Sequence, residues 1–228
     1  QTLTSFTCKL AEDGERIQNN HLYLAPPDVH LLIDKGVMIL GHGPQENRWR
    51  PSIDMLFRSA AAAYNSRVIG IILTGLMQDG TAGMESIKRS GGTLIVQDPE
   101  EAEYPDMPQS VLQNMEVDYC VSLTKMGAII SEKTRNGLPP NKEVPHDIFV
   151  EAELSRKVAI SIDTLASVGT HSPFSCPDCG GHLYFVNSEN IEHYKCHVGH
   201  SYTEGELLFQ MTNSLEATLW VALRMLEE

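Results

Sequence analysis

VIGIILTGLMQDGTAG, residues 68–83, is the stretch that decides the fold predicted for this chain. It begins with a short apolar run rich in β-branched residues, which is typical of a strand covered on both faces in a parallel sheet. The run breaks into a glycine-rich loop at residues 74–75, and a helical pattern follows until Gly91 and Gly92. A second short apolar run occupies residues 93–96. Strand, helix and strand within about thirty residues predict a βαβ unit with a right-handed crossover.

Asp79 lies in the loop of this unit, beyond the carboxyl end of the first strand, where open α/β sheets place their ligand sites. At a helix N-terminus its carboxylate is expected to stay ionised, because backbone N–H groups and the helix dipole stabilise negative charge there. An ionised and immobile aspartate is what a catalytic histidine needs to hold its tautomer. The structural alternative is that Asp79 only caps the helix that follows it, in an Asp-Gly turn.

Further short strands and helices are predicted around this unit. Strands are expected at residues 21–25, 29–33, 37–40 and 118–122, the last one buried and containing Cys120. Helices are expected to begin near residues 51, 108 and 124. Asp34-Lys35-Gly36 is a hairpin signal. His30 and His42 are candidate catalytic bases, although lone histidines at strands or turns are more often structural or exposed.

Five stretches follow one another along the first part of the chain: AEDGERI (11–17), YLAPPDVHLL (23–32), GPQENRWRPSID (43–54), ILTGLMQDGTAGM (72–84) and VQDPEEAEYPDMPQS (96–110). Together, over roughly residues 10 to 133, they resemble the catalytic domain of CheB-type chemotaxis protein-glutamate methylesterases. The resemblance implies a Ser-His-Asp triad that hydrolyses methyl esters of receptor glutamates, with Asp79 as the aspartate. The same acyl chemistry accepts a glutamine amide, which gives deamidation.

The triad implied by the resemblance is incomplete in these 228 residues. The family's serine and histidine follow its first two strands, and their motifs are expected before residue 1 because they do not occur here. Asp79 is then the only triad member in the chain, and we expect the chain to be inactive without the other two.

The loop itself departs from the family pattern. The family usually has Thr-Gly-Met-Gly where this chain has Leu76 and Met77, so a positive φ at residue 77 would be strained. The resemblance places an oxyanion-hole N–H at Leu76. Arg48 and Arg50 lie on a loop that follows the active-site cleft in the family, where they would steer an acidic receptor helix or else remain solvated.

Composition excludes several classes of function. A formal net charge of −13 argues against nucleic-acid binding, which needs a basic surface to neutralise phosphates. No window approaches eighteen uninterrupted apolar residues and no signal-peptide pattern is present at the start, so we expect a cytoplasmic protein that does not insert into the membrane. Five cysteines, three of them clustered, indicate a metal site rather than a disulfide framework.

The second strong motif is a pair of cysteines, Cys176 and Cys179, followed after sixteen residues by Cys196-His197-Val198-Gly199-His200. Two thiolates on one tight turn and a second pair across a hairpin complete a tetrahedron around Zn²⁺. His200 is the preferred fourth ligand, because the spacing and Gly199 let the second knuckle turn.

The alternatives for the fourth ligand are His197 and, less directly, His182 and His193. Three cysteines and one histidine close the coordination sphere, so the zinc is predicted to be structural. The Cys-x-Val-Gly-His ending also resembles a zinc-ribbon tail that some methylesterases of this group have.

The predicted architecture is an α/β fold with a mostly parallel, doubly wound sheet and flanking helices, plus a small zinc-ribbon domain and a C-terminal helix. The predicted boundaries are residues 1–136 for the catalytic domain, 137–148 for a proline-rich linker, 149–170 for a connecting helix, 171–202 for the ribbon and 203–228 for an amphipathic helix.

Two functions of different classes fit these observations. The first is hydrolysis of glutamate methyl esters, with the cytoplasmic helices of methylated chemoreceptors as partners. The second is a catalytically incomplete binding or scaffold module that acts through the ribbon and the terminal helix. That helix would pair with a second copy of the chain or with a signalling protein.

Overall fold

The computed structural model describes residues 6–137, 139–156, 165–166, 168–187 and 192–227. The chain divides into two compact units. Unit 1 comprises Gln1–Gly43 and Trp49–Val158, and unit 2 comprises Pro44–Arg48 and Ala159–Glu228.

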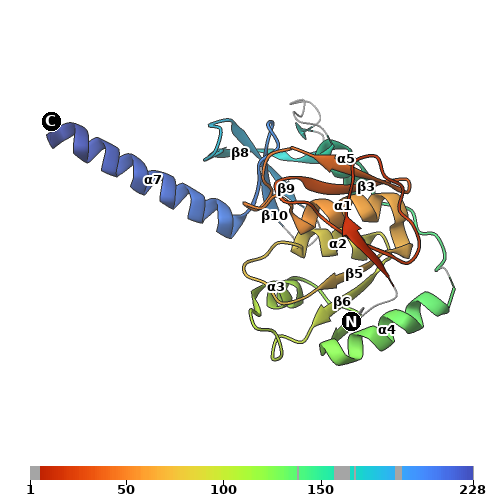
Figure 1. The fold of residues 1–228 in the computed structure, drawn as a ribbon. Helices are drawn as coiled ribbons and strands as arrows, with labels where there is room; N and C mark the ends of the chain where they lie inside the picture. Colours follow the sequence, from red (N-terminus) through yellow and green to blue (C-terminus); the bar gives the residue numbers. More distant parts are fainter. Residues whose placement is uncertain (1–5, 138, 157–164, 167, 188–191, 228) are drawn as a thin grey trace. The chain divides into compact units, whose positions relative to one another are not determined.

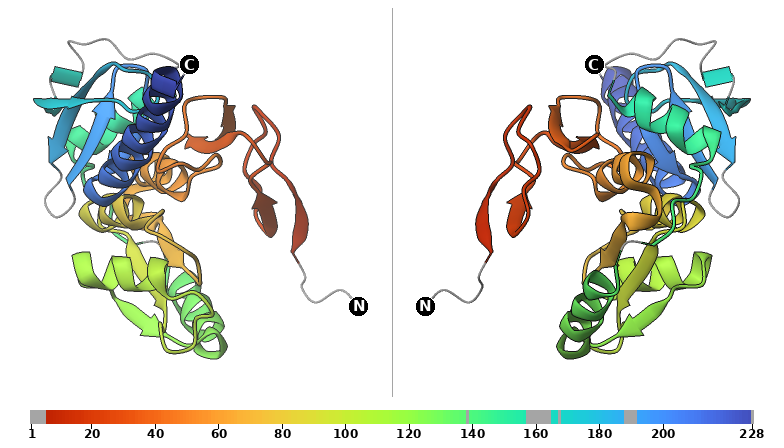
Figure 2. Two further views of the ribbon diagram at one scale, coloured as in Figure 1. Left: turned by 90° about the vertical axis from the view of Figure 1, so that its left-hand side faces the viewer. Right: turned by 90° about the vertical axis from the view of Figure 1, so that its right-hand side faces the viewer.

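Unit 1 is a mixed α/β structure (Figures 1 and 2). Its elements are β1 (Thr7–Leu10), β2 (His21–Leu24), β3 (His30–Asp34), β4 (Val37–Gly41), α1 (Ile53–Tyr64), η1 (Asn65–Arg67), β5 (Ile69–Ile72), α2 (Thr81–Arg89), β6 (Thr93–Gln97), α3 (Asp106–Asn114), β7 (Tyr119–Val121), α4 (Leu123–Arg135) and α5 (His146–Ser155).

The predicted βαβ unit is confirmed. β5 and β6 pair in parallel from Ile69 opposite Thr93 to Ile72 opposite Val96, and α2 connects them. A Cβ atom on Gly70 would lie 2.6 Å from the Met84 sulfur, so glycine lets α2 pack directly against β5. The buried apolar side chains of the two strands and the helix form the centre of this unit: Ile72, Met84, Ile87, Leu94, Ile95 and Val96.

The parallel sheet has the order β5-β6-β7, which makes β7 an edge strand of the described sheet. The prediction that this strand is buried is therefore wrong at Cys120, whose side chain is exposed. Nearby Asp98 and partial burial still raise the pKa of the Cys120 thiol, with burial the larger cause.

The predicted hairpin at residues 34–36 is also confirmed. β3 and β4 pair antiparallel, and Lys35 and Gly36 both have positive φ, 45° and 87°. Positive φ at both central residues is the geometry that joins two strands by a tight turn. α1 packs against β3 on one side and against α2 on the other, so it lies between the hairpin and the parallel sheet (Figures 1 and 2).

Helix α5 belongs to unit 1, where it packs on α1. The sequence predicts a connecting helix over residues 149–170, whereas α5 covers His146–Ser155 and residues 157–164 lie outside the described part. Its position is set by ion pairs: Arg58 Nε lies 3.2 Å from Glu151 Oε2 with both side chains buried, and Arg89 donates two hydrogen bonds to Asp147.

Unit 2 contains a four-stranded antiparallel sheet and a long helix. The elements are β8 (Thr170–Ser175), β9 (His182–Asn187), β10 (Glu192–Cys196), β11 (Ser201–Thr203) and α7 (Glu204–Glu227), and the strand order is β11-β10-β9-β8. Helix α7 lies where the sequence predicts an amphipathic helix over residues 203–228, the last of which is outside the described residues. It begins with a capping box, in which Glu206 accepts from the Thr203 backbone N–H and donates its own N–H to the Thr203 hydroxyl. None of the helices in the described residues is long and apolar enough to cross a membrane.

Replacing Glu151 with alanine is expected to destabilise unit 1 by about 3–5 kcal/mol, because the change leaves Arg58 buried without its carboxylate. Urea unfolding measures the change. The matched control is Glu153→Ala, which removes an exposed partner of Arg156 and should cost less than about 1 kcal/mol. If both variants lost the same free energy of unfolding, the buried ion pair between Arg58 and Glu151 would not be what holds α5 on α1.

Candidate functional site

Asp79 is buried and bound to the N-terminus of α1. Its Oδ1 accepts hydrogen bonds from the Ser52 hydroxyl at 2.8 Å and from the Asp54 backbone N–H at 3.3 Å, and its Oδ2 accepts one from the Ile53 backbone N–H at 2.8 Å. Backbone N–H groups in the first turn of a helix have no partner within the helix and carry partial positive charge. The carboxylate is thereby held in one orientation by three donors.

The alternative in which Asp79 caps the helix after it is wrong for α2. The N-cap of α2 is Gly80, with φ 95°, a residue without a side chain that could cap the helix. A Cβ atom at Gly80 would lie 2.5 Å from the Ile72 side chain, so the turn requires glycine for space as well as for its left-handed backbone. Asp79 therefore caps α1, through bonds to Ser52, Ile53 and Asp54, which precede it by 25 to 27 positions along the chain.

A second carboxylate makes the reverse contact. Asp54, in the first turn of α1, accepts a 2.6 Å hydrogen bond from the backbone N–H of Gly83 in α2. A Cβ atom on Gly83 would lie 2.5 Å from Phe57 Cβ, so only glycine permits this close approach of the two helices. The start of α1 is thus bound to Asp79, which lies just before α2, and the start of α2 is bound to Asp54, which lies in α1.

His30 is fully buried beside the same helix start. Its Nδ1 accepts a hydrogen bond from the Ser52 backbone N–H, with 3.3 Å between the two nitrogens. Of the two candidate bases, His30 is the one that the structure brings to Ser52, through the Ser52 backbone N–H. His42 is exposed on the loop after β4.

The loop before Asp79 is fixed by the acidic segment after β6. Gly75 donates its N–H to Tyr104 O and accepts from Met107 N, and the Met77 N–H donates to Asp106 Oδ2 at 3.2 Å. Met77 has φ 69°, so the expected left-handed backbone is present at a residue with a long side chain. Leu76, where the family resemblance places an oxyanion-hole N–H, has an exposed side chain between these anchored residues.

The two arginines of the loop after β4 have partners. Arg50 donates to Asp28 through Nε and Nη2 and to Gly43 O through Nη1, and it lowers the pKa of the Asp28 carboxyl by hydrogen bonding and charge. Arg48, which belongs to unit 2, lies over the Phe209 ring at 4.9 Å. Neither guanidinium is simply a solvated charge on a loop.

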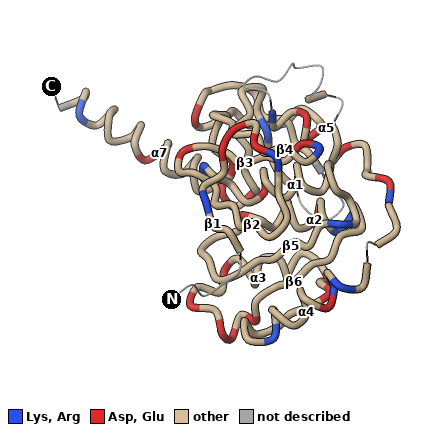
Figure 3. Tube along the Cα trace, turned by 45° about the vertical axis from the view of Figure 1, so that its right-hand side comes forward, with Lys and Arg blue, Asp and Glu red and all other residues tan. Residues whose placement is uncertain are grey.

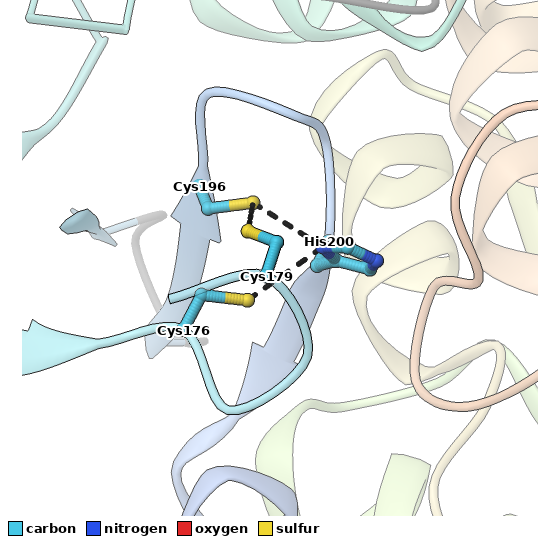
Figure 4. Close-up of side chains that lie close together, drawn as sticks. All are labelled: Cys176, Cys179, Cys196 and His200. Carbon is cyan, nitrogen blue, oxygen red and sulfur yellow. Dashed lines mark hydrogen bonds between the residues drawn. The ribbon is translucent and has the colours of Figure 1, made fainter. Parts of the chain in front are cut away.

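In unit 2, the four predicted ligands lie together (Figure 4). Their donor atoms, the sulfurs of Cys176, Cys179 and Cys196 and a nitrogen of His200, all lie within 4.8 Å of one another. Among the described residues, His197, His182 and His193 are not part of this group.

The spacing of the donors fits a tetrahedral ion. Zinc bonds of about 2.3 Å to sulfur and 2.0–2.1 Å to nitrogen imply edges of about 3.8 Å between sulfurs and about 3.6 Å between sulfur and nitrogen. The sulfurs of Cys179 and Cys196 are 3.7 Å apart, and His200 Nδ1 lies 3.6 Å from the Cys176 sulfur and 3.5 Å from that of Cys196. These residues could therefore hold a metal ion.

The electrostatics of the cluster favour a cation. Hydrogen bonds from Cys196, and then from His200 and Tyr202, lower the pKa of the Cys176 thiol to about 3 against the effect of burial. The Cys176 sulfur in turn raises the pKa of Cys196, with burial as the next cause, and it raises the pKa of His200. Binding of a metal ion to these thiols would release their protons, because the thiolate is the form of cysteine that ligates a metal.

Two further side chains surround the cluster, and the sequence analysis did not single them out. Asp178 Oδ2 lies 4.0 Å from His200 Nε2, the ring nitrogen away from the sulfurs, and Tyr202 donates a 2.6 Å hydrogen bond to the same oxygen. A carboxylate behind a ligating histidine orients the ring and fixes its tautomer. Asp178 lies between Cys176 and Cys179 in the sequence, and this position is the signal that could have identified it.

The first part of the chain is similar to known proteins. A family model described as CheB methylesterase matches residues 1–130. A Leptospira interrogans protein provisionally named protein-glutamate methylesterase/protein-glutamine glutaminase is 40% identical over 139 residues, which are 60% of this chain and 72% of that protein. A Photorhabdus laumondii protein-glutamate methylesterase/protein-glutamine glutaminase is 36% identical over 139 residues, which are 59% of this chain and 40% of that protein.

The crystal structure of the Thermotoga maritima CheB methylesterase catalytic domain is similar as well, with a TM-score of 0.53 and 36% identity over 55% of this chain and 68% of that chain. The matched part of this chain thus spans most of the Leptospira relative and less than half of the Photorhabdus one. The family model ends at residue 130, so the cysteine and histidine cluster lies beyond it.

Replacing Ser52 with alanine is expected to lower the free energy of unfolding by about 1–3 kcal/mol, because it removes a buried hydrogen bond to a carboxylate. Thermal and urea unfolding check this value. Ser131→Ala, at an exposed position on α4, should change it by no more than about 0.5 kcal/mol. A Ser52 variant as stable as this control would show that the hydroxyl contributes nothing to holding Asp79.

Proposed function

The chain belongs to the CheB methylesterase family, and from that premise we propose that it takes part in hydrolysing glutamate methyl esters on chemotaxis receptors. The relatives that carry the family activity are named for both ester hydrolysis and glutamine deamidation. Both reactions proceed through one acyl intermediate, so we propose both for this chain. The partners are the cytoplasmic helices of methylated chemoreceptors.

The observation that carries the proposal is the fixed carboxylate of Asp79. In the proposed reaction, a serine hydroxyl attacks the ester carbonyl while a histidine accepts its proton, and Asp79 orients that histidine. The histidine then gives the proton to the leaving methoxide, which departs as methanol, and water releases the free glutamate from the serine. An aspartate held by three donors on a rigid helix start meets the need for an immobile orienting group.

The serine and histidine are proposed to come from outside these 228 residues, on a segment that packs against β1 and β2. Apolar side chains on these strands are about half exposed, as expected for a surface that another strand or helix covers: Leu10, Leu22 and Leu24. The N–H of Leu76 is the proposed donor to the oxyanion that forms on the ester carbonyl.

We propose that the cluster of unit 2 binds Zn²⁺ through Cys176, Cys179, Cys196 and His200, with a structural role. The ion would supply four bonds that hold two turns together, and a closed set of ligands leaves no position for a substrate. The supporting observation is the agreement between the donor distances and the edges of a zinc tetrahedron.

A second candidate function is binding through α7. Figure 3 shows few charged residues along this helix, and many large apolar side chains on it are exposed: Leu208, Phe209, Leu215, Leu219, Trp220, Val221, Leu223, Met225 and Leu226. An apolar helix face of this kind pairs with another helix, of a second copy or of a signalling protein. The chain would then act as a scaffold whether or not it is catalytically complete.

Methanol release from methylated receptor membranes tests the catalytic proposal. The 228-residue chain is compared with a version that carries the family's serine and histidine segment before residue 1, and only the longer form is expected to release methanol. In that form Asp79→Asn should lower the turnover rate by about 10⁴-fold, as for the loss of a triad aspartate. Asp13→Asn, an exposed aspartate that binds the Leu40 N–H, is the control and should leave the rate unchanged. Full activity of the Asp79 variant would refute the triad role, and inactivity of both forms would favour the scaffold function.

The purified chain is expected to contain one zinc ion, measured by elemental analysis, and Cys196→Ser should lose it. Asp178→Asn should weaken zinc binding by about 10–100-fold in a chelator competition, because the histidine loses its orienting carboxylate. Glu216→Gln, on the exposed face of α7, serves as the control. Zinc content unaffected by the Cys196 change would place the ion elsewhere.

A further inference from the structure

Two stretches of unit 1 that are far apart in the sequence are bound to each other: residues 74–77, in the loop after β5, and residues 104–107, which lead into α3. The Tyr104 N–H donates to the Thr74 hydroxyl at 2.8 Å. Tyr104 O accepts from the Gly75 N–H at 2.9 Å and from the Thr74 hydroxyl at 3.3 Å. Segment 104–107 therefore holds the beginning of the loop through both backbone and side chain.

The peptide group between Gly75 and Leu76 is held by Met107. Gly75 O accepts a hydrogen bond from the Met107 N–H at 3.0 Å. This peptide bond is trans, and in a planar trans peptide the C=O and the N–H point in opposite directions, so the Leu76 N–H points away from Met107. A Cβ atom on Gly75 would overlap the Met107 sulfur, so the contact requires glycine at this position. The direction of the Leu76 N–H is thus set by a hydrogen bond from segment 104–107.

The next peptide group, between Leu76 and Met77, is held by a side chain. The Met77 N–H donates to Asp106 Oδ2 at 3.2 Å. Met77 has φ 69°, and a residue with a side chain keeps this left-handed conformation only where surrounding contacts hold it. The carboxylate of Asp106 supplies such a contact.

Leu76 itself differs from its neighbours in the loop. Within the described part of the chain its N–H makes no hydrogen bond, and the residue is exposed. A free N–H between two fixed peptide groups is a donor whose direction is set before a substrate binds. Donors of this kind stabilise an oxyanion strongly, because they need no reorganisation while the negative charge develops.

We propose that Asp106 is a positioning residue for the Leu76 N–H. Together with the Met107 N–H, its carboxylate fixes the two peptide groups that flank the Cα atom of Leu76, so that the free N–H keeps one direction. This inference rests on the proposed function, in which that N–H donates to the oxyanion of the ester carbonyl. The role of Asp106 is indirect and acts through the backbone of the loop.

Hydrogen exchange of the Met77 amide, followed by NMR on the 228-residue chain, tests the contact. Exchange is expected to be about tenfold faster in Asp106→Ala and to stay within about threefold in Asp106→Asn, because the asparagine oxygen also accepts a hydrogen bond. Asp106 is also the first residue of α3, where its charge stabilises the helix start. Since both variants remove that charge, the difference between them reports the hydrogen bond alone.

Methanol release by the longer form, which carries the serine and histidine segment, tests the positioning role. Asp106→Ala should lower kcat by about 10–100-fold with KM unchanged, because the loss of an interaction made only in the transition state lowers kcat and kcat/KM equally. Asp106→Asn should keep at least about a third of the rate, since it keeps the acceptor. The control is Glu103→Ala, which removes an exposed acidic side chain of the same loop and should change neither constant.

The outcomes separate this inference from the proposed function. If exchange at Met77 rose in the alanine variant while its kcat matched that of the unmodified longer form, the positioning role would be wrong and the esterase function would stand. Equal losses of kcat in the alanine and asparagine variants would assign the effect to the charge at the start of α3 and would also overturn the role. Unchanged exchange at Met77 in the alanine variant would overturn the contact with Asp106. A longer form that released no methanol before any substitution would refute the proposed function, and the inference with it.

Discussion

The fold of unit 1 depends on an exchange of carboxylates between two helix starts. Asp79 binds the first turn of α1, and Asp54 of α1 binds the Gly83 N–H of α2. Both contacts are buried, so each aspartate compensates N–H groups that would otherwise lose water without gaining a partner. These two contacts also hold Asp79 in place. The position of the aspartate in the proposed triad therefore depends on the packing of α1 on α2.

Unit 2 depends on a different interaction. Its apolar core is small, and two of its buried members are the cluster cysteines Cys176 and Cys196, packed with Leu183, Tyr202 and Leu207. A sheet of this size buries little apolar surface, so bonds to a metal would contribute a large part of its folding free energy. The position of Asp178 and Tyr202 around the cluster shows that polar groups also surround these cysteines and His200.

Much of the local structure was predictable because its signals are local. The hairpin at residues 34–36, the strands β5 and β6 and the helix α7 follow from turn residues and apolar periodicity within short windows. The clustering of the four candidate ligands was predictable for a similar reason, since Cys176 and Cys179 share one turn and Cys196 and His200 share another. The exposure of Cys120 could not be predicted in this way, because whether a strand is central or at an edge depends on its neighbours in the sheet.

By itself, the sequence determined the βαβ unit, the hairpin, the terminal helix and the family pattern, and it singled out the candidate site residues. Only the tertiary structure decided that Asp79 caps α1 instead of α2, that α5 packs on α1 through Arg58, and that segment 44–48 joins the sheet of unit 2. The physical reason is sequence separation. Propensity and periodicity act over a few residues, whereas these contacts join residues from about 25 to more than 150 positions apart and exist only after the chain has folded.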